Sequence, residues 1–160
     1  MAPARRSVVF QCALVLALAR ACQSLPTSVT TLAGSGTSGL VNLIGTSAQF
    51  SYPYAVAVDA SEKVYVVDTV KSVIRVIAPN GAVTTLAGKG TSSSLIDADG
   101  TNAGFNFPMG IAIDSYGRVI VADRDNSAIR RIMPNGTVTT LATGLNSPNG
   151  VAVDSGGYVW

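Results

Sequence analysis

A pattern of about forty residues occurs more than once in this chain of 160 residues. Residues 50–88 and 105–144 share most apolar positions and turn residues, 145–160 repeats the beginning of the pattern, and VTTLAG at 29–34 repeats its end. The shared prolines, Pro53, Pro108 and Pro148, lie 55 and 40 residues apart, so about fifteen residues are inserted between the first two copies. Such repeats stack as similar units that bury their apolar faces against one another.

Each full copy contains four short apolar runs separated by turn residues. The first runs, AVAVD, GIAID and GVAVD, alternate with the period of two that is typical of strands. The dipeptides Asn80-Gly81 and Asn135-Gly136 separate the third and fourth runs, and Asn-Gly favours a type I′ hairpin turn with positive φ at both residues. We therefore predict an all-β fold: an incomplete β-propeller of four-stranded blades, two of them full and two partial.

The linked positions P-x-G-[VI]-A-[VI]-D, [VI]-x-V-[VA]-D-x-x-[NK]-x-x-I-R and G-x-V-T-T-L-A-G resemble the NHL repeat, over about Thr27 to Trp160. The resemblance implies a propeller, which in this family usually closes with about six blades. It thus implies an amino-terminal fragment with blades at 50–88 and 105–144, a truncated blade at 145–160 and an orphan fourth strand at 29–34.

The amino-terminal segment has the order of a secretory signal peptide. Two arginines precede a run of twelve mostly apolar residues at 8–19, which ends near the small residues Ala19 and Ala21. A membrane span needs roughly twenty apolar residues, so we predict a cleaved signal at 1–21, a linker at 22–28, a secreted protein and no membrane span.

Removal of residues 1–21 leaves eight basic and nine acidic residues, with no Lys/Arg cluster. The mature chain is therefore not expected to bind nucleic acid. Cys12 and Cys22 lie in or beside the signal, so no internal disulfide is predicted. Cys22 follows a small residue, as in a lipoprotein site, although Ala19 and Arg20 fit that pattern poorly.

Antiparallel blades send alternate connections to opposite ends. The fourth-to-first connections, 35–49 and 89–104, are predicted to lie at the same end as the second-to-third connections, 69–72 and 124–127. Long loops on a rigid frame are the usual binding surface. We predict that this end binds a protein, peptide or glycan, with the ligand-binding candidates Lys71, Arg124, Asp125 and Asn126.

Repeated charged residues admit two interpretations. Asp68 and Asp123 end the second runs, either as ligands of a channel metal or substrate or, as we favour, as turn-fixing side chains that accept backbone N–H bonds. Arg75 and Arg130 either grip an anion or, as we favour, make a hydrogen bond between blades or an ion pair with a neighbouring aspartate. The aspartates that close the first runs are predicted to form turns: Asp59, Asp114 and Asp154.

Evidence for catalysis is thin, because the chain has no histidine and no mature cysteine beyond Cys22. We predict no catalytic residue and no cofactor. Asp97 and Asp99 begin a D-x-D-G segment, which makes them weak candidates for a calcium site, but no acidic residue follows at the twelfth position. An interaction module is favoured over an enzyme. The alternative is a metal-dependent hydrolase or lactonase of the gluconolactonase-like kind, with ligands mostly in further blades.

The chain has one N-x-[ST] sequon, Asn135-Gly136-Thr137, in a predicted exposed turn. We expect glycosylation at Asn135 if a eukaryote secretes the protein. Outer blades that present apolar faces to water also predict self-association.

Overall fold

The computed structural model describes residues 9–10, 13–14, 29–92 and 94–160. Within the predicted signal peptide, Val9–Phe10 (β1) pairs with Ala13–Leu14 (β2) in an antiparallel ladder. The cleavage position after Ala21, the linker 22–28 and both cysteines lie outside the described residues. No helix among the described residues has the length and apolar character needed to cross a bilayer.

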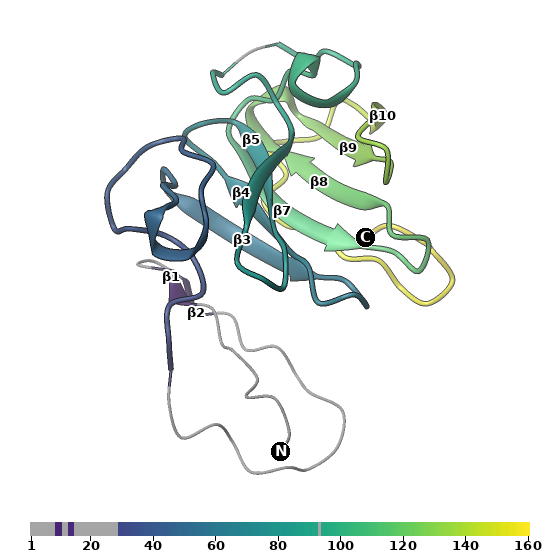
Figure 1. The fold of residues 1–160 in the computed structure, drawn as a ribbon. Helices are drawn as coiled ribbons and strands as arrows, with labels where there is room; N and C mark the ends of the chain where they lie inside the picture. The colour runs from purple at the N-terminus through teal and green to yellow at the C-terminus, as the bar shows by residue number, and fades with distance from the viewer. Residues whose placement is uncertain (1–8, 11–12, 15–28, 93) are drawn as a thin grey trace.

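Two four-stranded antiparallel sheets make up the body of the fold, and they confirm the all-β prediction (Figure 1). The first sheet pairs its strands in chain order: Pro53–Val58 (β3), Val64–Asp68 (β4), Val73–Ile77 (β5) and Val83–Ala87 (β6). The second does the same with Pro108–Ile113 (β7), Val119–Asp123 (β8), Ala128–Ile132 (β9) and Val138–Ala142 (β10). Among the described residues, three short 3-10 helices lie in connections: Gly45–Ser47 (η1), Gly100–Asn102 (η2) and Arg124–Asn126 (η3).

The two sheets stack face to face as adjacent propeller blades, with β3 beside β7 (Figure 1). Their shared core joins Val67, Ile74 and Ala87 of the first blade to Phe105 and the apolar face of the second. Phe105 has no exposed surface, and Phe50, at the same place in the first blade, has 8%. Because branched residues on both faces of a strand are buried only between neighbouring blades, the repeat itself dictates the stacking.

The partial repeats pack as the full ones do, although they form little regular strand structure. Leu32 and Ala33 lie against the Phe50 cluster, as Leu86 and Ala87 lie against the Phe105 cluster. Residues 29–34 form no strand among the described residues, since no described third strand lies beside them. In the last repeat, a bridge joins Val153 to Val159.

The fourth-to-first connections depart from their predicted place. Instead of staying at one end of the blades, each runs back along the outer edge of the next fourth strand. Leu43 O accepts the N–H of Val83 at 3.1 Å, and Ala98 O accepts that of Val138 at 2.9 Å. Each then reaches the opposite end, where the Gly100 N–H donates to Gly136 O at 3.0 Å. The physical reason is that an outermost strand presents unpaired backbone groups, which the insertion satisfies.

The Asn-Gly turns join adjacent antiparallel strands, as predicted, but they are not type I′. Positive φ occurs at Gly81 (86°) and Gly136 (93°) and not at Asn80 or Asn135. The Gly81 N–H donates to Ala78 O at 2.8 Å, which closes a turn with Pro79 at its second position. Proline favours type I geometry there, and the glycine that follows supplies the left-handed residue of a longer hairpin loop.

The outer face of the second blade, which the last repeat covers only in part, leads to a first prediction. Leu141 and Trp160 are 41% and 77% exposed, so the chain should form dimers or larger species that bury this face. Light scattering of the chain from Cys22 onward, under reducing conditions, measures this. Leu141→Glu should shift the distribution toward monomer. Tyr116→Ser, which removes an equally prominent side chain (74% exposed) from a distant turn, should not. A monomeric wild-type chain would contradict the prediction.

Candidate functional site

The aspartates at the ends of the second strands are buried and hold the chain around them. Asp68 Oδ1 accepts the Ser51 N–H at 2.7 Å, and Asp123 Oδ1 accepts the Asn106 N–H at 2.8 Å. Each therefore fixes the segment that leads into the first strand of its own blade. This geometry agrees with the favoured interpretation that the two side chains have a structural role.

The repeated arginines complete the same arrangement. Arg75 Nη1 donates to Asp68 Oδ2 at 3.0 Å, and Arg130 Nη1 donates to Asp123 Oδ2 at 2.9 Å, with all four side chains fully buried. Both pairs lie within one blade, joining its second and third strands, so the favoured ion pair with a neighbouring aspartate is present.

The same guanidinium groups also bind the two fourth-to-first connections, 35–49 and 89–104, which run along the edges of β6 and β10. Arg130 Nη1 also donates to Gly104 O at 2.7 Å, and Nη2 donates to Ile96 O and Asp97 Oδ1, both at 2.8 Å. Arg75 makes the corresponding bonds to Gln49 O, Val41 O and Asn42 Oδ1, each at 3.0 Å or less. In each blade, one planar guanidinium group thus binds two separate parts of the same connection.

A phenylalanine lies against each buried arginine. The guanidinium carbon lies 4.8 Å from the ring centre of Phe50 in the first blade and 4.9 Å from that of Phe105 in the second. These contacts were missed in the sequence, where the available signal was an equal spacing: Phe50 to Arg75 and Phe105 to Arg130. A cation over an aromatic face gains electrostatic stabilisation when both are desolvated.

Burial dominates the ionisation of the paired groups. It raises the pKa of Asp68 to about 6, against the opposing effects of the Ser51 N–H and the Arg75 charge. Burial likewise raises the pKa of Asp123, against the bonds from Asn106, Asn126 and Arg130. The backbone N–H bonds and the arginine charge therefore both counteract the effect of burial on these two carboxyl groups.

The aspartates that close the first strands form turns, as predicted. Asp114 Oδ1 accepts the N–H groups of Tyr116 and Arg118, both at 2.9 Å, and Asp59 and Asp154 accept the equivalent pairs. Burial acts to raise the pKa of Asp114, but these bonds and the Arg118 guanidinium lower it overall. The side chain is therefore an acceptor that works best as a carboxylate.

The predicted ligand-binding residues gather in the second-to-third connections, at the end where β3 and β7 begin. In the second blade they form η3: Arg124 and Asp125 side chains are 38% and 39% exposed and lie 3.7 Å apart. Asn126 Nδ2 donates to Asp123 Oδ2 at 2.9 Å, which gives it a structural contact. In the first blade, the half-buried Lys71 occupies the position of Asn126.

The weak calcium candidates contact the neighbouring strand. Asp97 accepts bonds from Arg130 and from the N–H and hydroxyl of Thr140, and Asp99 accepts the Thr137 hydroxyl at 2.6 Å. Both therefore help to hold the insertion against β10. Across the described ranges, no group of three or more His, Cys, Asp or Glu side chains could hold a metal ion.

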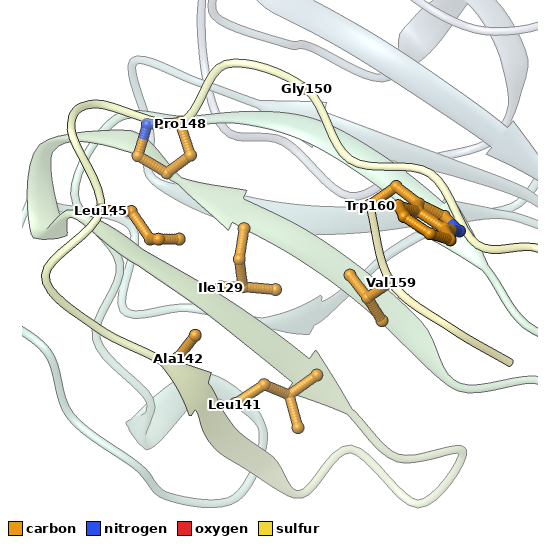
Figure 2. Close-up of a pocket in the computed structure, with 8 residues that line it drawn as sticks. All are labelled: Ile129, Leu141, Ala142, Leu145, Pro148, Gly150, Val159 and Trp160. Atoms are coloured by element: carbon orange, nitrogen blue, oxygen red, sulfur yellow. The ribbon is translucent and has the colours of Figure 1, made fainter.

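A largely apolar hollow of about 530 Å³ lies between β9, β10 and the last repeat. Figure 2 shows Ile129, Leu141 and Ala142 on one side and Val159 and Trp160 across from them. The same positions of the first blade, Ile74 and Ala87, are covered by the second blade. The hollow is thus the counterpart of a face that is packed elsewhere in the same chain.

Comparison with known proteins identifies the repeat. Residues 105–132, which include β7, β8 and η3, match the family model described as the NHL repeat. The chain contains an NHL repeat. It is also 35% identical over 95 residues to NHL repeat-containing protein 2 of Bos taurus and 34% identical to that of Gallus gallus. These matches cover 58% of the chain and 13% of each relative, so the chain spans a small part of their length.

Solved structures agree on the fold. An auxiliary nutrient binding protein from Bacteroides thetaiotaomicron is similar with a TM-score of 0.55 and 18% identity, covering 63% of this chain and 32% of that one. A gluconolactonase from Xanthomonas campestris is similar with a TM-score of 0.55 and 24% identity, covering 70% and 35%. Likeness at this identity supports the propeller architecture that the two stacked blades show.

A second prediction concerns the buried ion pair. Arg130→Met should destabilise the chain by about 3–5 kcal/mol, because it leaves Asp123 buried without a counter-charge and removes the bonds that hold the insertion at residues 96–97 and 104. Arg131→Met, one residue along the same strand and half-buried, should cost about 1 kcal/mol or less. Urea unfolding monitored by circular dichroism compares the two. Equal losses of stability in the two variants would show that the Arg130–Asp123 ion pair makes no special contribution to the stability of the blade.

A third prediction follows from the lowered pKa of Asp114. A carboxyl whose folded pKa lies below its ordinary 3.8 stabilises the fold above that value, and the contribution is lost as the pH falls through the folded pKa. Asp114→Asn should cost about 1 kcal/mol at neutral pH and less near pH 3. Urea unfolding at both pH values checks this, with Asp125→Asn as the control for an exposed charge. A cost that is the same at both pH values would refute it.

Proposed function

We propose that the chain is part of a secreted binding module whose ligand contacts the second-to-third connections, with Lys71 and Arg124 as the principal groups. The observation that carries this proposal is a difference between two sets of charged side chains at one end of the blades. The carboxylates of Asp68 and Asp123 are buried and paired, whereas the Arg124 and Asp125 side chains at the same end are exposed and Lys71 is half-buried.

The backbone that presents these side chains is firmly held. Thr69 Oγ1 donates to Pro108 O of the next blade at 2.8 Å, and the Asp125 N–H donates to Asn106 O at 3.0 Å. Ser72 and Ser127, which close the two loops, adopt left-handed φ values of 50° and 53°. Loops whose backbone is already fixed lose less conformational entropy when a ligand binds, so this arrangement favours binding without a conformational change.

The charges indicate the ligand chemistry. Lys71 and Arg124 are cationic, and the Asp125 carboxylate lies 3.7 Å from the Arg124 guanidinium. An acidic protein or peptide segment, or an anionic glycan, complements this surface, because a guanidinium group can donate two parallel hydrogen bonds to two oxygens of a carboxylate or a sulfate group. Exposed loop charges contribute to ligand selection and to the rate of association.

A metal-dependent hydrolase is less well supported. A channel metal needs carboxylate oxygens that point to the propeller axis, whereas Asp68 and Asp123 already direct both oxygens to protein donors. The similarity to a gluconolactonase extends to the fold alone. We therefore place recognition, rather than hydrolysis, at this end of the chain.

A fourth prediction tests the binding surface by charge reversal. The wild-type chain should bind at least one of two acidic probes, a polyglutamate peptide and heparin, in a biosensor assay at low salt. Lys71→Glu combined with Arg124→Glu should weaken that binding by roughly tenfold or more and reduce its salt dependence.

Lys63→Glu is the matched control for this experiment. Lys63 is exposed in the turn between β3 and β4, at the opposite end of the blade, so the same charge change there should leave binding unchanged. Equal losses in both variants would indicate a general charge effect. No binding to either probe, or full binding by the double variant, would remove the proposed surface.

A further inference from the structure

We propose that Asn135 carries an N-linked glycan and that the glycan is added before the insertion 89–104 packs against β10. The site is the hairpin between β9 and β10, at the end of the blade opposite the second-to-third connections. The proposal is independent of the ligand of those connections, and it rests on delivery of the chain into the secretory pathway by residues 1–21.

The side chain of Asn135 is placed so that the folded blade can accommodate a glycan. It is exposed, and its Oδ1 accepts the Thr137 N–H at 3.1 Å. That bond orients the amide, while Nδ2, the atom that bears an N-linked sugar, has no protein partner among the described residues. A sugar on Nδ2 therefore displaces no contact of the fold.

The covalent step requires one co-reactant, an oligosaccharide joined through its anomeric carbon to a lipid pyrophosphate. The Asn135 Nδ2 forms a bond to that anomeric carbon, the bond from the carbon to the pyrophosphate oxygen breaks, and the lipid pyrophosphate leaves with the electron pair. The amide loses one proton to a base of the cellular transferase. No oxidation or reduction occurs.

The folded structure sets the order of events. The Thr137 hydroxyl, which the transferase must recognise in an N-x-T sequon, donates to Asp99 Oδ1 at 2.6 Å. The Gly136 carbonyl accepts the Gly100 N–H at 3.0 Å. Both partners belong to the insertion 89–104, so the sequon is engaged once the insertion is in place and is available only before then.

The first blade contains an equivalent hairpin that lacks the hydroxyl group required for an N-x-[ST] sequon. Asn80 is exposed in the same turn, and its Oδ1 accepts the Ala82 N–H at 3.0 Å. Ala82 has no hydroxyl, and the residue bridged to it is Ile44, where Asp99 stands in the second blade. Ala82→Thr therefore creates a second sequon in equivalent geometry with no acidic acceptor beside it.

The fifth prediction is tested by translating the full chain in an extract supplemented with microsomes. The protease-protected chain should run as one glycosylated species that an N-glycosidase converts to the unmodified form. The shift should be absent in Asn135→Gln, unchanged in Asn80→Gln, and doubled in Ala82→Thr. Mass analysis after enzymatic release should find aspartate at position 135.

The timing is tested by adding microsomal transferase and its lipid-linked donor to the purified, folded, unmodified chain. Wild-type chain should remain unmodified, whereas Asp99→Ala, which frees the Thr137 hydroxyl, should gain measurable modification. A protected chain without a glycan, a shift that survives Asn135→Gln, or a chain left outside the microsomes would each overturn the site. Rapid modification of the folded wild-type chain would overturn the proposed order.

Discussion

The buried ion pair between the third-strand arginine and the second-strand aspartate is the interaction on which each blade depends. In the second blade, Arg130 joins Asp123 to two carbonyls and one carboxylate of the insertion, and it lies over Phe105. One residue thereby connects the sheet, its edge cover and the aromatic anchor of the interface between blades. Buried charges are costly unless they are paired and hydrogen-bonded, so loss of any one partner affects all of them.

This buried ion pair also determines which parts of the blade are available for ligand binding. The repeated geometry engages the carboxylates of Asp68 and Asp123 in contacts within the blade, whereas the second-to-third connections differ between blades as TVKS and RDNS. A rigid frame with variable loops is suited to recognition, because sequence changes in the loops alter the ligand without loosening the sheet. The hairpin at the other end is the place where a glycan leaves those loops uncovered.

Much of the fold was predictable from residues that recur at fixed spacing. The period-two runs identified the strands, and the turn residues Asp59, Asp114 and Asp154 took the predicted role. The type of the Asn-Gly turns was predicted wrongly, because Pro79 and Pro134 favour a type I start that the dipeptide alone does not reveal. The candidate loop residues were brought to one end of the blades, but Asn126 proved to support Asp123.

The sequence by itself determined the blades, their strand order and their stacking, because these depend on local periodicity and on apolar faces that every copy repeats. Only the tertiary structure decided the path of the insertions and the partners of Asp97 and Asp99. Those contacts join residues more than thirty positions apart, and nothing in the local pattern of 89–104 shows that it will cover the edge of β10. Edge pairing is decided by which backbone groups remain unsatisfied after the sheet forms, and that is a property of the assembled blade.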